Sequence, residues 1–462
     1  MTSATPSTAT VGDAPAATGQ TPVVDKTTRR RVIIASTVGT TIEFYDFYAY
    51  ATAAVAVFPY LFFPKNEDPT VGLLASFATF GLAFVARPLG SVVFGHFGDR
   101  VGRKVTLVAS LLTMGIATFI IGLLPTYASI GILAPALLAV MRFCQGLGLG
   151  GEWSGAALLA SENAEPGKRA RAAMWPQLGA PFGFFLANAV FLILVAVLGH
   201  ETGSTEGAFM EWGWRIPFLL SAVMVIIGLY VRFKLEETPV FKAAVDSGKK
   251  ADSPLGEVFK TAWRPMIMGT AVMLSTYTLF YLVTTWVLSY GIANPQKSAG
   301  LGIPYVDFLK IQLFTICFFM IAVPLSGRWA DQIGRRKFLA IISGLMLVFA
   351  TTFGIFLNQE SATMTGVTIW LAVGMFLIGL IFGPMSAVLP EMFPTNVRYT
   401  GSGISYNVSS ILGAAIAPFI ATALVNTHGV GSVGAYLAVV TFLTLIAILK
   451  MKETKDIDLN HV

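Results

Sequence analysis

Ionisable side chains occur well inside several long apolar segments of this 462-residue sequence. A charged side chain in the middle of a membrane costs at least about 2.5–3.5 kcal/mol, so each one should face a partner or an aqueous cavity. All of them belong to the first half of the chain: Glu43, Asp46, Arg87, Arg142 and Glu152. A carboxylate can carry a proton and a guanidinium can hold an anion, so these residue types predict a site that handles both.

The predicted proton-coupling residues are Asp46, Glu43 and Arg142. Glu43 and Asp46 are three residues apart and share a helix face, and Arg142 lies at a similar depth in another segment. Because arginine stays protonated and the histidines lie in loops or in the tail, a carboxylate must carry the proton. Burial favours the neutral acid and a nearby guanidinium favours the carboxylate, so Asp46 beside Arg142 would change its proton affinity as the cavity opens to either side.

Protonation of Asp46 would then free Arg142 to hold an anionic substrate. Glu43 shares the same helix face and stays an alternative carrier of the proton. The competing interpretation is a permanent buried ion pair that only fixes helix packing. The same alternative applies to Glu152 and to Arg87, which is interpreted as a buried ion nearer the cytoplasmic side.

Polar and aromatic side chains are expected to complete the cavity lining. The second half has no charge inside its segments, so it would supply hydrogen bonds and ring faces. Each of these side chains could instead pack helices together. The predicted substrate-binding residues are Arg142, Tyr45, Gln145, Glu152, Trp153, Gln177, Tyr277, Tyr281, Gln312 and Asn407.

The elements that must position these residues are membrane helices. Hydrophobic residues make up 55% of the chain and charged residues 12%, about half the charged share of soluble domains. Apolar runs of roughly 20 residues recur, each long enough to span the hydrocarbon core. We predict an all-α polytopic membrane protein with twelve transmembrane helices in two pseudo-symmetric six-helix bundles. The segments lie near 33–61, 71–97, 104–125, 130–160, 170–198, 214–234, 264–291, 306–327, 338–358, 366–390, 398–426 and 431–450.

The polar stretches and their charges predict the topology. Lysine and arginine concentrate in the loops after even-numbered segments, which places these loops and both termini in the cytoplasm. The net charge of +6 fits this bias and needs no nucleic-acid partner. The predicted parts are a disordered cytoplasmic tail (1–31), a six-helix bundle (32–234), a cytoplasmic linker (235–262), a second six-helix bundle (263–450) and a short cytoplasmic tail (451–462).

An internal repeat marks the cytoplasmic loops. Asp99 and Arg103 recur as Asp331 and Arg335 at one constant offset close to half the chain length, as expected for two copies of one unit. Acidic and basic residues also follow the fourth and tenth segments. Opposite charges there could pair in one conformation and separate when the helices move, although solvated loops are the plainer interpretation. The predicted gating residues are Asp99, Arg100, Arg103, Glu162, Arg169, Asp331, Arg335, Glu391 and Arg398.

The sequence from Asp99 to Lys104, repeated after the eighth segment, resembles the loop signature of the major facilitator superfamily. A narrower set of motifs resembles the metabolite:proton symporter family, whose members carry dicarboxylates, citrate, shikimate, or proline and betaine. The motifs are Glu43-Phe44-Tyr45-Asp46-Phe47, Arg87-Pro88-Leu89-Gly90, Arg142-Phe143-Cys144-Gln145-Gly146, Gly150-Gly151-Glu152-Trp153, Trp214-Arg215-Ile216-Pro217-Phe218, Glu236-Glu237-Thr238-Pro239-Val240-Phe241, Glu391-Met392-Phe393-Pro394-Thr395 and Arg398-Tyr399-Thr400-Gly401.

The resemblance and the buried carboxylates together predict a transporter in the cytoplasmic membrane rather than an enzyme. We expect proton-coupled import of a small organic anion, such as shikimate or a di- or tricarboxylate, by a monomer that alternates access between its two sides. No phosphate-binding loop is present, and neither a cofactor nor a metal is expected. The alternatives are uptake of a zwitterionic osmolyte, facilitated diffusion without a proton, and a membrane sensor that binds its ligand without moving it.

Overall fold

The structure is a computed structural model and contains helices and loops, with no strand within the described residues. It describes residues 26–64, 69–101, 103–150, 153, 157–158, 160–161, 164, 167–199, 204–233, 259–394, 397–455 and 457. Within these ranges the side chains of 26–32, 95–107 and 232–233 are not described.

The first half of the chain forms one group of long helices. Its long helices carry apolar residues around most of their circumference, as expected for helices that contact lipid on one side and other helices on the other. The elements are α1 (Lys26–Ala56), α2 (Phe58–Leu61), α3 (Pro69–Val101), α4 (Arg103–Leu123), α5 (Tyr127–Ile130), α6 (Leu133–Leu149), α8 (Arg169–Gln177), α9 (Gly179–Leu198), α10 (Ala208–Glu211), η1 (Gly213–Arg215), α11 (Ile216–Leu219) and α12 (Ser221–Phe233).

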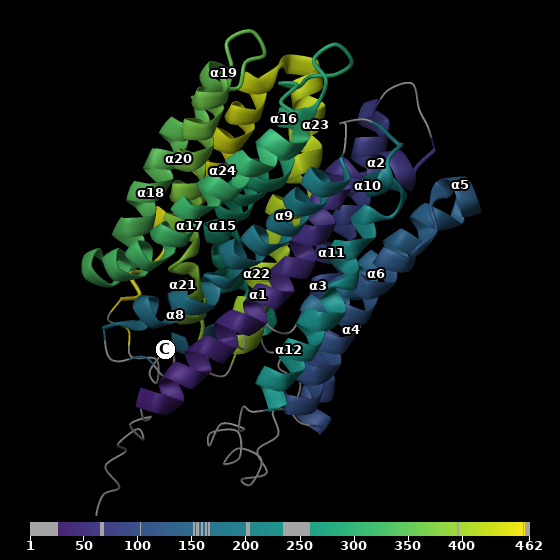
Figure 1. Cartoon of the computed structure of the whole chain (residues 1–462). Helices are drawn as coiled ribbons and strands as arrows, with labels where there is room; N and C mark the ends of the chain where they lie inside the picture. The colour runs from purple at the N-terminus through teal and green to yellow at the C-terminus, as the bar shows by residue number, and fades with distance from the viewer. Residues whose placement is uncertain are drawn as a thin grey trace, which may run out of the picture.

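The second half forms a second group beside the first (Figure 1). Two of its long helices are interrupted by π-helical turns, η2 and η3, which are frequent at functional sites. The elements are α15 (Trp263–Tyr281), η2 (Leu282–Trp286), α16 (Val287–Ile292), α17 (Tyr305–Ile333), α18 (Arg335–Ala350), α19 (Phe353–Phe356), α20 (Met364–Phe382), α21 (Met385–Glu391), α22 (Arg398–Ser410), η3 (Ile411–Ala415), α23 (Ala417–His428) and α24 (Val430–Lys450).

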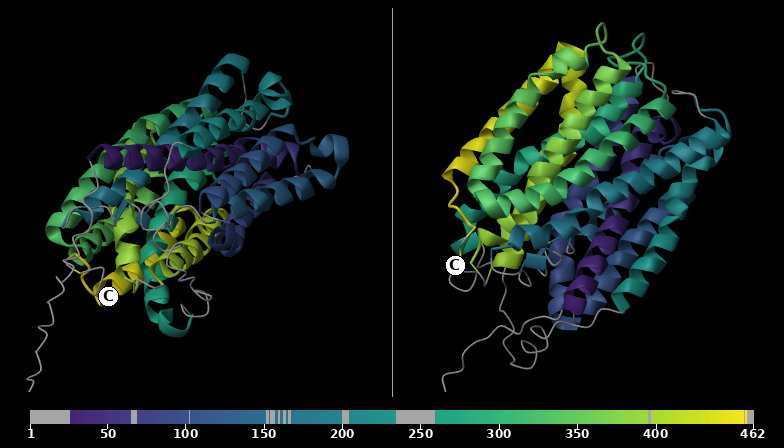
Figure 2. Two further views of the ribbon diagram at one scale, coloured as in Figure 1. Left: turned by 90° about the horizontal axis from the view of Figure 1, so that it is seen from below. Right: turned by 60° about the vertical axis from the view of Figure 1, so that its left-hand side comes forward.

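Each predicted membrane segment coincides with described helices. Among the described residues, eight helices are long and apolar enough to cross a membrane, and the apolar helices Val108–Leu123 and Leu133–Leu149 are shorter. The predicted all-α polytopic fold is therefore confirmed. The helices run between two ends of the molecule. The end where α1 begins and α24 finishes, here called the terminal end, is the lower one in Figure 1 and in the right-hand view of Figure 2.

Glycines allow α3 and α6 to cross at close range. A Cβ added to Gly146 would collide with the backbone of Ala83, and one added to Gly150 would collide with the backbone of Arg87. Small residues are typical of such crossings in membranes, because close backbone packing has to hold the helices together there. The crossing brings Arg87 of α3 and Arg142 of α6 within electrostatic reach of each other.

Candidate functional site

Asp46 on α1 is completely buried inside the first half. Its Oδ2 lies 2.8 Å from the hydroxyl of Ser221 and 3.2 Å from that of Thr118, while its Oδ1 has no hydrogen-bond partner. The single Thr118 proton has a second acceptor, the carbonyl oxygen of Met114 at 2.9 Å. If Thr118 donates to that carbonyl, Asp46 can complete the network only as a protonated acid that donates to Thr118.

Arg142 on α6 is also completely buried but does not contact Asp46 directly. Its guanidinium donates to the Gln145 side chain and, at 3.4 Å, to the carbonyl of Phe80. The guanidinium carbon lies 4.0 Å from the ring centroid of Tyr50 and 4.3 Å from that of Phe47. The rings hold the cation through the negative face of their π systems.

Thr118 and Gln145 connect the two charged groups. Gln145 Nε2 donates to the Thr118 hydroxyl at 2.8 Å, and Thr118 in turn reaches Asp46. No ion pair joins Asp46 to Arg142 in the described part of the chain, so the competing interpretation of a permanent buried pair finds no support in this conformation. Two neutral side chains, Gln145 and Thr118, lie between the two charged groups, and Nη2 of Arg142 has no hydrogen-bond partner among the described residues.

Glu43, one turn before Asp46, belongs to a different charged group. It is buried and lies within electrostatic reach of Arg87. The guanidinium carbon of Arg87 lies 5.1 Å from the ring centroid of Phe47 and 5.3 Å from that of Phe84, and its Nε has no hydrogen-bond partner among the described residues. Glu43 therefore interacts electrostatically with Arg87, while Asp46 is linked to Arg142 through Thr118 and Gln145.

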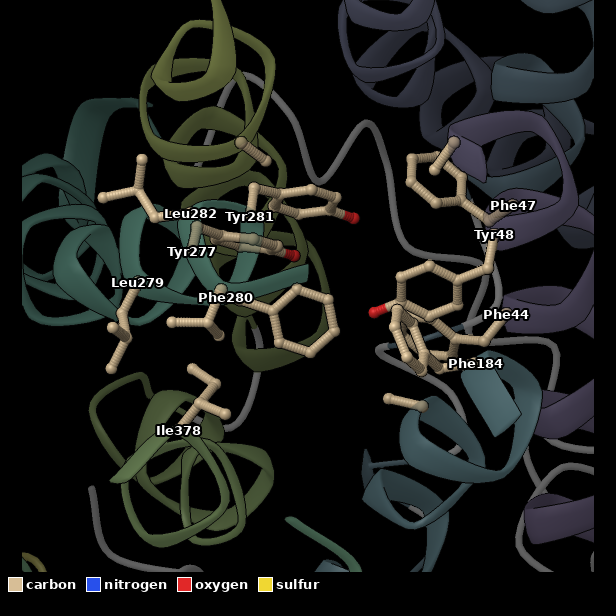
Figure 3. Close-up of a cluster of buried hydrophobic side chains, with 14 of the residues drawn as sticks. Phe44, Phe47, Tyr48, Phe184, Tyr277, Leu279, Phe280, Tyr281, Leu282 and Ile378 are labelled. Atoms are coloured by element: carbon tan, nitrogen blue, oxygen red, sulfur yellow. The ribbon is translucent and has the colours of Figure 1, made fainter. Parts of the chain in front are cut away.

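A small cavity of about 10 Å³ lies between the two halves, beside Arg87. It has room for about one water molecule, so the site is occluded in this conformation. Figure 3 shows aromatic side chains of the two halves facing each other beside this cavity. The cavity lining consists of Phe44, Arg87, Thr276, Tyr277, Phe280, Tyr281, Phe382 and Tyr406.

The structure places only part of the predicted lining at this cavity. Tyr277 and Tyr281 line it. Arg142 and Gln145 bond to each other beside it, and the hydroxyl of Tyr45 donates to the carbonyl of Pro217 at 2.8 Å, inside the first half. These three residues are not among those that line the closed cavity, and their role in substrate binding stays a prediction.

Other predicted residues join the halves rather than line the cavity. The Trp153 ring stacks on that of Tyr406, with centroids 3.8 Å apart, and donates to Gln177. Gln177 donates to the carbonyl of Phe382 at 3.0 Å. Asn407 donates to the Ser91 hydroxyl at 3.1 Å. Apart from the bond between Trp153 and Gln177, which lies within the first half, these contacts link the two halves.

The last described residue of the predicted set is Gln312. Gln312 on α17 donates to the carbonyl of Thr284 in η2 at 2.7 Å and stays within the second half. Glu152 lies outside the described residues. Sequence reasoning missed Tyr48, Phe44, Thr276 and Tyr406, which lie at or beside the cavity. The spacing of Phe44 and Tyr48, four residues apart as in Tyr277 and Tyr281, is the signal that could have found them.

The gating residues of the second half form a cluster at the terminal end. Glu391 lies 3.3 Å from Arg335 and 3.3 Å from Arg169 of the first half. Arg335 also pairs with Asp331 at 2.9 Å. Asp331 accepts backbone N–H bonds from Ala170 and Arg171 at 3.1 and 2.9 Å, and so caps the N-terminus of α8.

This cluster holds the two halves together at the terminal end. Ser386 of α21 adds a hydrogen bond of 2.7 Å to the carbonyl of Ala173 in α8. Arg398 is buried and donates to the carbonyl of Phe393 at 3.2 Å, within the second half. The side chains of the remaining predicted gating residues are outside the described set: Asp99, Arg100, Arg103 and Glu162.

Comparison with known proteins identifies the family of this chain. The family model of the Major Facilitator Superfamily matches residues 37–411 and 307–460. An inner membrane metabolite transport protein of Escherichia coli is 54% identical over 92% of this chain and 95% of its own length. The shikimate transporter of Escherichia coli is 35% identical over 92% and 95%, and the proline/betaine transporter of Salmonella typhimurium is 33% identical over 96% and 87%.

A solved structure shares the fold. A major facilitator superfamily proton:xylose symporter bound to 6-bromo-6-deoxy-D-glucose matches with a TM-score of 0.68 at 16% identity, over 94% of this chain and 98% of that one. The family expected from the loop motifs is thus confirmed. The chain is a multi-pass membrane protein that belongs to the major facilitator superfamily of transporters, and within it to the metabolite:proton symporter family.

Proposed function

We propose that this protein is a secondary active transporter that imports a small organic anion together with a proton. The observation that carries this proposal is Asp46, a fully buried carboxyl group with two hydroxyl neighbours, whose other oxygen has no hydrogen-bond partner and which contacts no cation among the described residues. An ionised carboxylate in such a place would be costly, and a protonated acid fits the hydrogen bonds. When the site opens, water would reach this carboxyl group and favour release of its proton. Such a change in proton affinity is what a proton-coupling residue requires.

Arg87 is the proposed contact for the substrate anion, in place of Arg142. It lines the cavity between the halves, where transporter sites usually lie. Glu43 lies within electrostatic reach of Arg87, so an arriving carboxylate would compete with Glu43 for this guanidinium. Protonation of Glu43 would remove this competition, which gives the second acid a role in binding.

The proposed transport cycle is alternating access of the two halves. The cavity is closed, and ion pairs and hydrogen bonds seal the terminal end. The positive-inside distribution assigns this end and both termini to the cytoplasm, in a cytoplasmic membrane. Both halves of the lining come from one chain, which supports a monomer as the transport unit.

Uptake into proteoliposomes tests the proposal. The purified chain is reconstituted, and accumulation of labelled shikimate, succinate, citrate and glycine betaine is measured with an acidic exterior and with no pH gradient. We expect one organic acid to accumulate above its external concentration, and a protonophore to abolish this accumulation. Equilibration that a protonophore does not change would show facilitated diffusion. Saturable binding of an acid without any flux would show a sensor, and either result overturns the proposal.

A further inference from the structure

The cavity between the halves contains more hydrogen-bonding groups than the protein satisfies. Arg87 Nε, Thr276 Oγ1 and the Tyr48 hydroxyl are buried and have no partner among the described residues. Arg87 and Thr276 line the cavity, and the Tyr48 ring lies 5.8 Å from that of Phe280, which also lines it. Buried polar groups without partners are costly, so a ligand that satisfies them gains affinity.

The unsatisfied groups face each other across the boundary between the halves. Figure 3 shows the hydroxyl of Tyr48 pointing from the first half towards the second, while the hydroxyls of Tyr277 and Tyr281 point back. All three hydroxyls interact electrostatically with Arg87. A molecule held here would therefore meet one cation and several hydroxyl groups at once.

The charges limit how many carboxylates the ligand carries. Among the described residues that line the cavity, Arg87 is the only cation. Its planar fork matches one carboxylate. A second carboxylate would lie against the rings of Phe44, Phe280 and Phe382 without a described cation to compensate it. Burial of such an unpaired charge is strongly unfavourable, which argues against di- and tricarboxylates.

The unsatisfied hydroxyls distinguish between the remaining substrate classes. A quaternary ammonium group cannot donate or accept a hydrogen bond, so it would leave Tyr48 and Thr276 unsatisfied. Hydroxyl groups on the ligand can both donate and accept, and the surrounding rings suit a compact carbon skeleton. We propose that the site binds a hydroxylated monocarboxylate, with its carboxylate at Arg87 and its hydroxyls at Tyr48 and Thr276. This inference rests on the proposed function in taking the cavity as the substrate site.

Calorimetric titration of the purified full-length chain tests this substrate class without any pH gradient. The ligands are shikimate, cyclohex-1-ene carboxylate (the same ring without hydroxyls), succinate, citrate and glycine betaine. We expect shikimate to bind at least tenfold more tightly than the ring without hydroxyls, and more tightly than the other three. Tightest binding by succinate, citrate or glycine betaine would overturn the proposal.

Matched variants link this preference to the named side chains. Tyr48→Phe and Thr276→Val keep the ring or the shape and remove one hydroxyl each. Each should reduce the preference for shikimate over cyclohex-1-ene carboxylate at least threefold and leave binding of the latter unchanged. The control variants are Tyr290→Phe and Thr278→Val, whose hydroxyls donate to the carbonyls of Leu357 and Leu274. An unchanged preference in both test variants would overturn the assignment.

The two proposals fail in different ways. A chain that prefers the hydroxylated monocarboxylate in titrations but never accumulates it under a pH gradient contradicts the proposed function alone. A chain that accumulates succinate or glycine betaine under a pH gradient contradicts the substrate class alone. If a test variant does not fold, the ligand preference of the unsubstituted chain still decides the substrate class.

A different observation concerns the segment that follows α24. Glu453 accepts the backbone N–H groups of Arg335 and Arg336 at 2.8 and 3.1 Å, so it caps the N-terminus of α18. The next residue, Thr454, donates to Glu391 at 2.6 Å. The carbonyl of Ile457 accepts a hydrogen bond from Arg169 of the first half. The segment therefore contacts three charged residues of the cluster that joins the halves.

We infer that the described residues 453–455 and 457, here called the strap, stabilise the closed terminal end. The strap positions Arg335 and Glu391, and it adds its own bond to the opposite half through Arg169. When the halves separate, the bond between Arg169 and Ile457 has to break. Loss of the strap should therefore shift the population towards the conformation open at this end.

Two truncations separate the strap from the remaining tail. Deletion of 453–462 removes the strap, and deletion of 458–462 is the control. The readout is thiol labelling of Ala173→Cys, which lies at the seal, after Cys144 and Cys317 are replaced by serine. We expect at least threefold faster labelling after the longer deletion and an unchanged rate after the shorter one. Equal rates in both, with normal thermal unfolding, would overturn the inference, and Glu453→Gln provides a second variant with the same expected direction.

Discussion

Asp46 and Arg142 do not touch, and two neutral side chains separate them. Gln145 accepts a hydrogen bond from Nη1 of Arg142 and donates to Thr118, which contacts the carboxyl group of Asp46. Gln145 also contacts the backbone carbonyl of Asp46 at 3.4 Å, so a change of protonation at Asp46 would act on Arg142 through the neutral side chains between them. This arrangement is the reason that we propose Asp46 for coupling and Arg87 for the anion contact.

Asp46→Asn should abolish accumulation driven by a pH gradient, because the amide keeps the size and hydrogen bonds of a protonated acid but cannot release a proton. Exchange of internal for external substrate should persist. The measurement is uptake into proteoliposomes with and without a pH gradient, beside a counterflow assay. Undiminished proton-driven accumulation would transfer the coupling role to another group.

Glu43→Gln is predicted to act on binding rather than on coupling alone. At high pH the ionised Glu43 of the unsubstituted chain would compete with the anion for Arg87. The glutamine lacks this charge, so the variant should bind the anion more tightly at high pH. Titration of the purified variant and of the unsubstituted chain across pH measures this difference. An affinity that depends on pH in the same way for both proteins would exclude Glu43 as the competitor.

Arg87→Lys should weaken substrate binding more than Arg142→Lys does. A lysine keeps the charge and loses the planar fork that matches a carboxylate. For Arg87, at the cavity, we expect a loss on the order of 2–5 kcal/mol if a buried charge pair is broken. Arg142 is held by Gln145 and three aromatic rings, so its substitution should reduce coupled transport first. Calorimetry and uptake on both variants separate the two roles, and the reverse order of affinities would restore Arg142 as the anion contact.

The sequence predicted the helices well and the lining of the site only in part. Apolar runs set helix length and position, because every backbone polar group in a membrane must be bonded within the helix. Which way a side chain faces depends on how the helices pack. Tyr45 and Tyr48 are one turn apart, yet the first bonds to Pro217 inside its own half and the second points to the opposite half. The electrostatic interaction of Glu43 with Arg87 likewise depends on how α1 and α3 pack, which no spacing along the chain encodes.

Gly146→Ala should destabilise the protein by roughly 1–3 kcal/mol, because the added methyl group would collide with the backbone of Ala83 at the α3–α6 crossing. Gly344→Ala is the matched control, since nothing lies within 4 Å of the position of its added Cβ on α18. That control should be neutral or slightly stabilising, as expected for alanine in a helix. Thermal unfolding of both variants in the same detergent is the measurement, and equal midpoints would show that the crossing tolerates separation.

Asp331→Asn should open the terminal end without altering the substrate site. Asp331 pairs with Arg335 and caps α8 of the opposite half, so loss of its charge weakens a contact that exists only while the halves are closed. We expect faster thiol labelling of Ala173→Cys, reduced transport and nearly unchanged ligand affinity. Asp307→Asn is the control, because Asp307 pairs with Lys310 on the exposed surface of α17. If transport falls in Asp331→Asn while labelling stays at the parental rate, the cluster serves folding or insertion rather than gating.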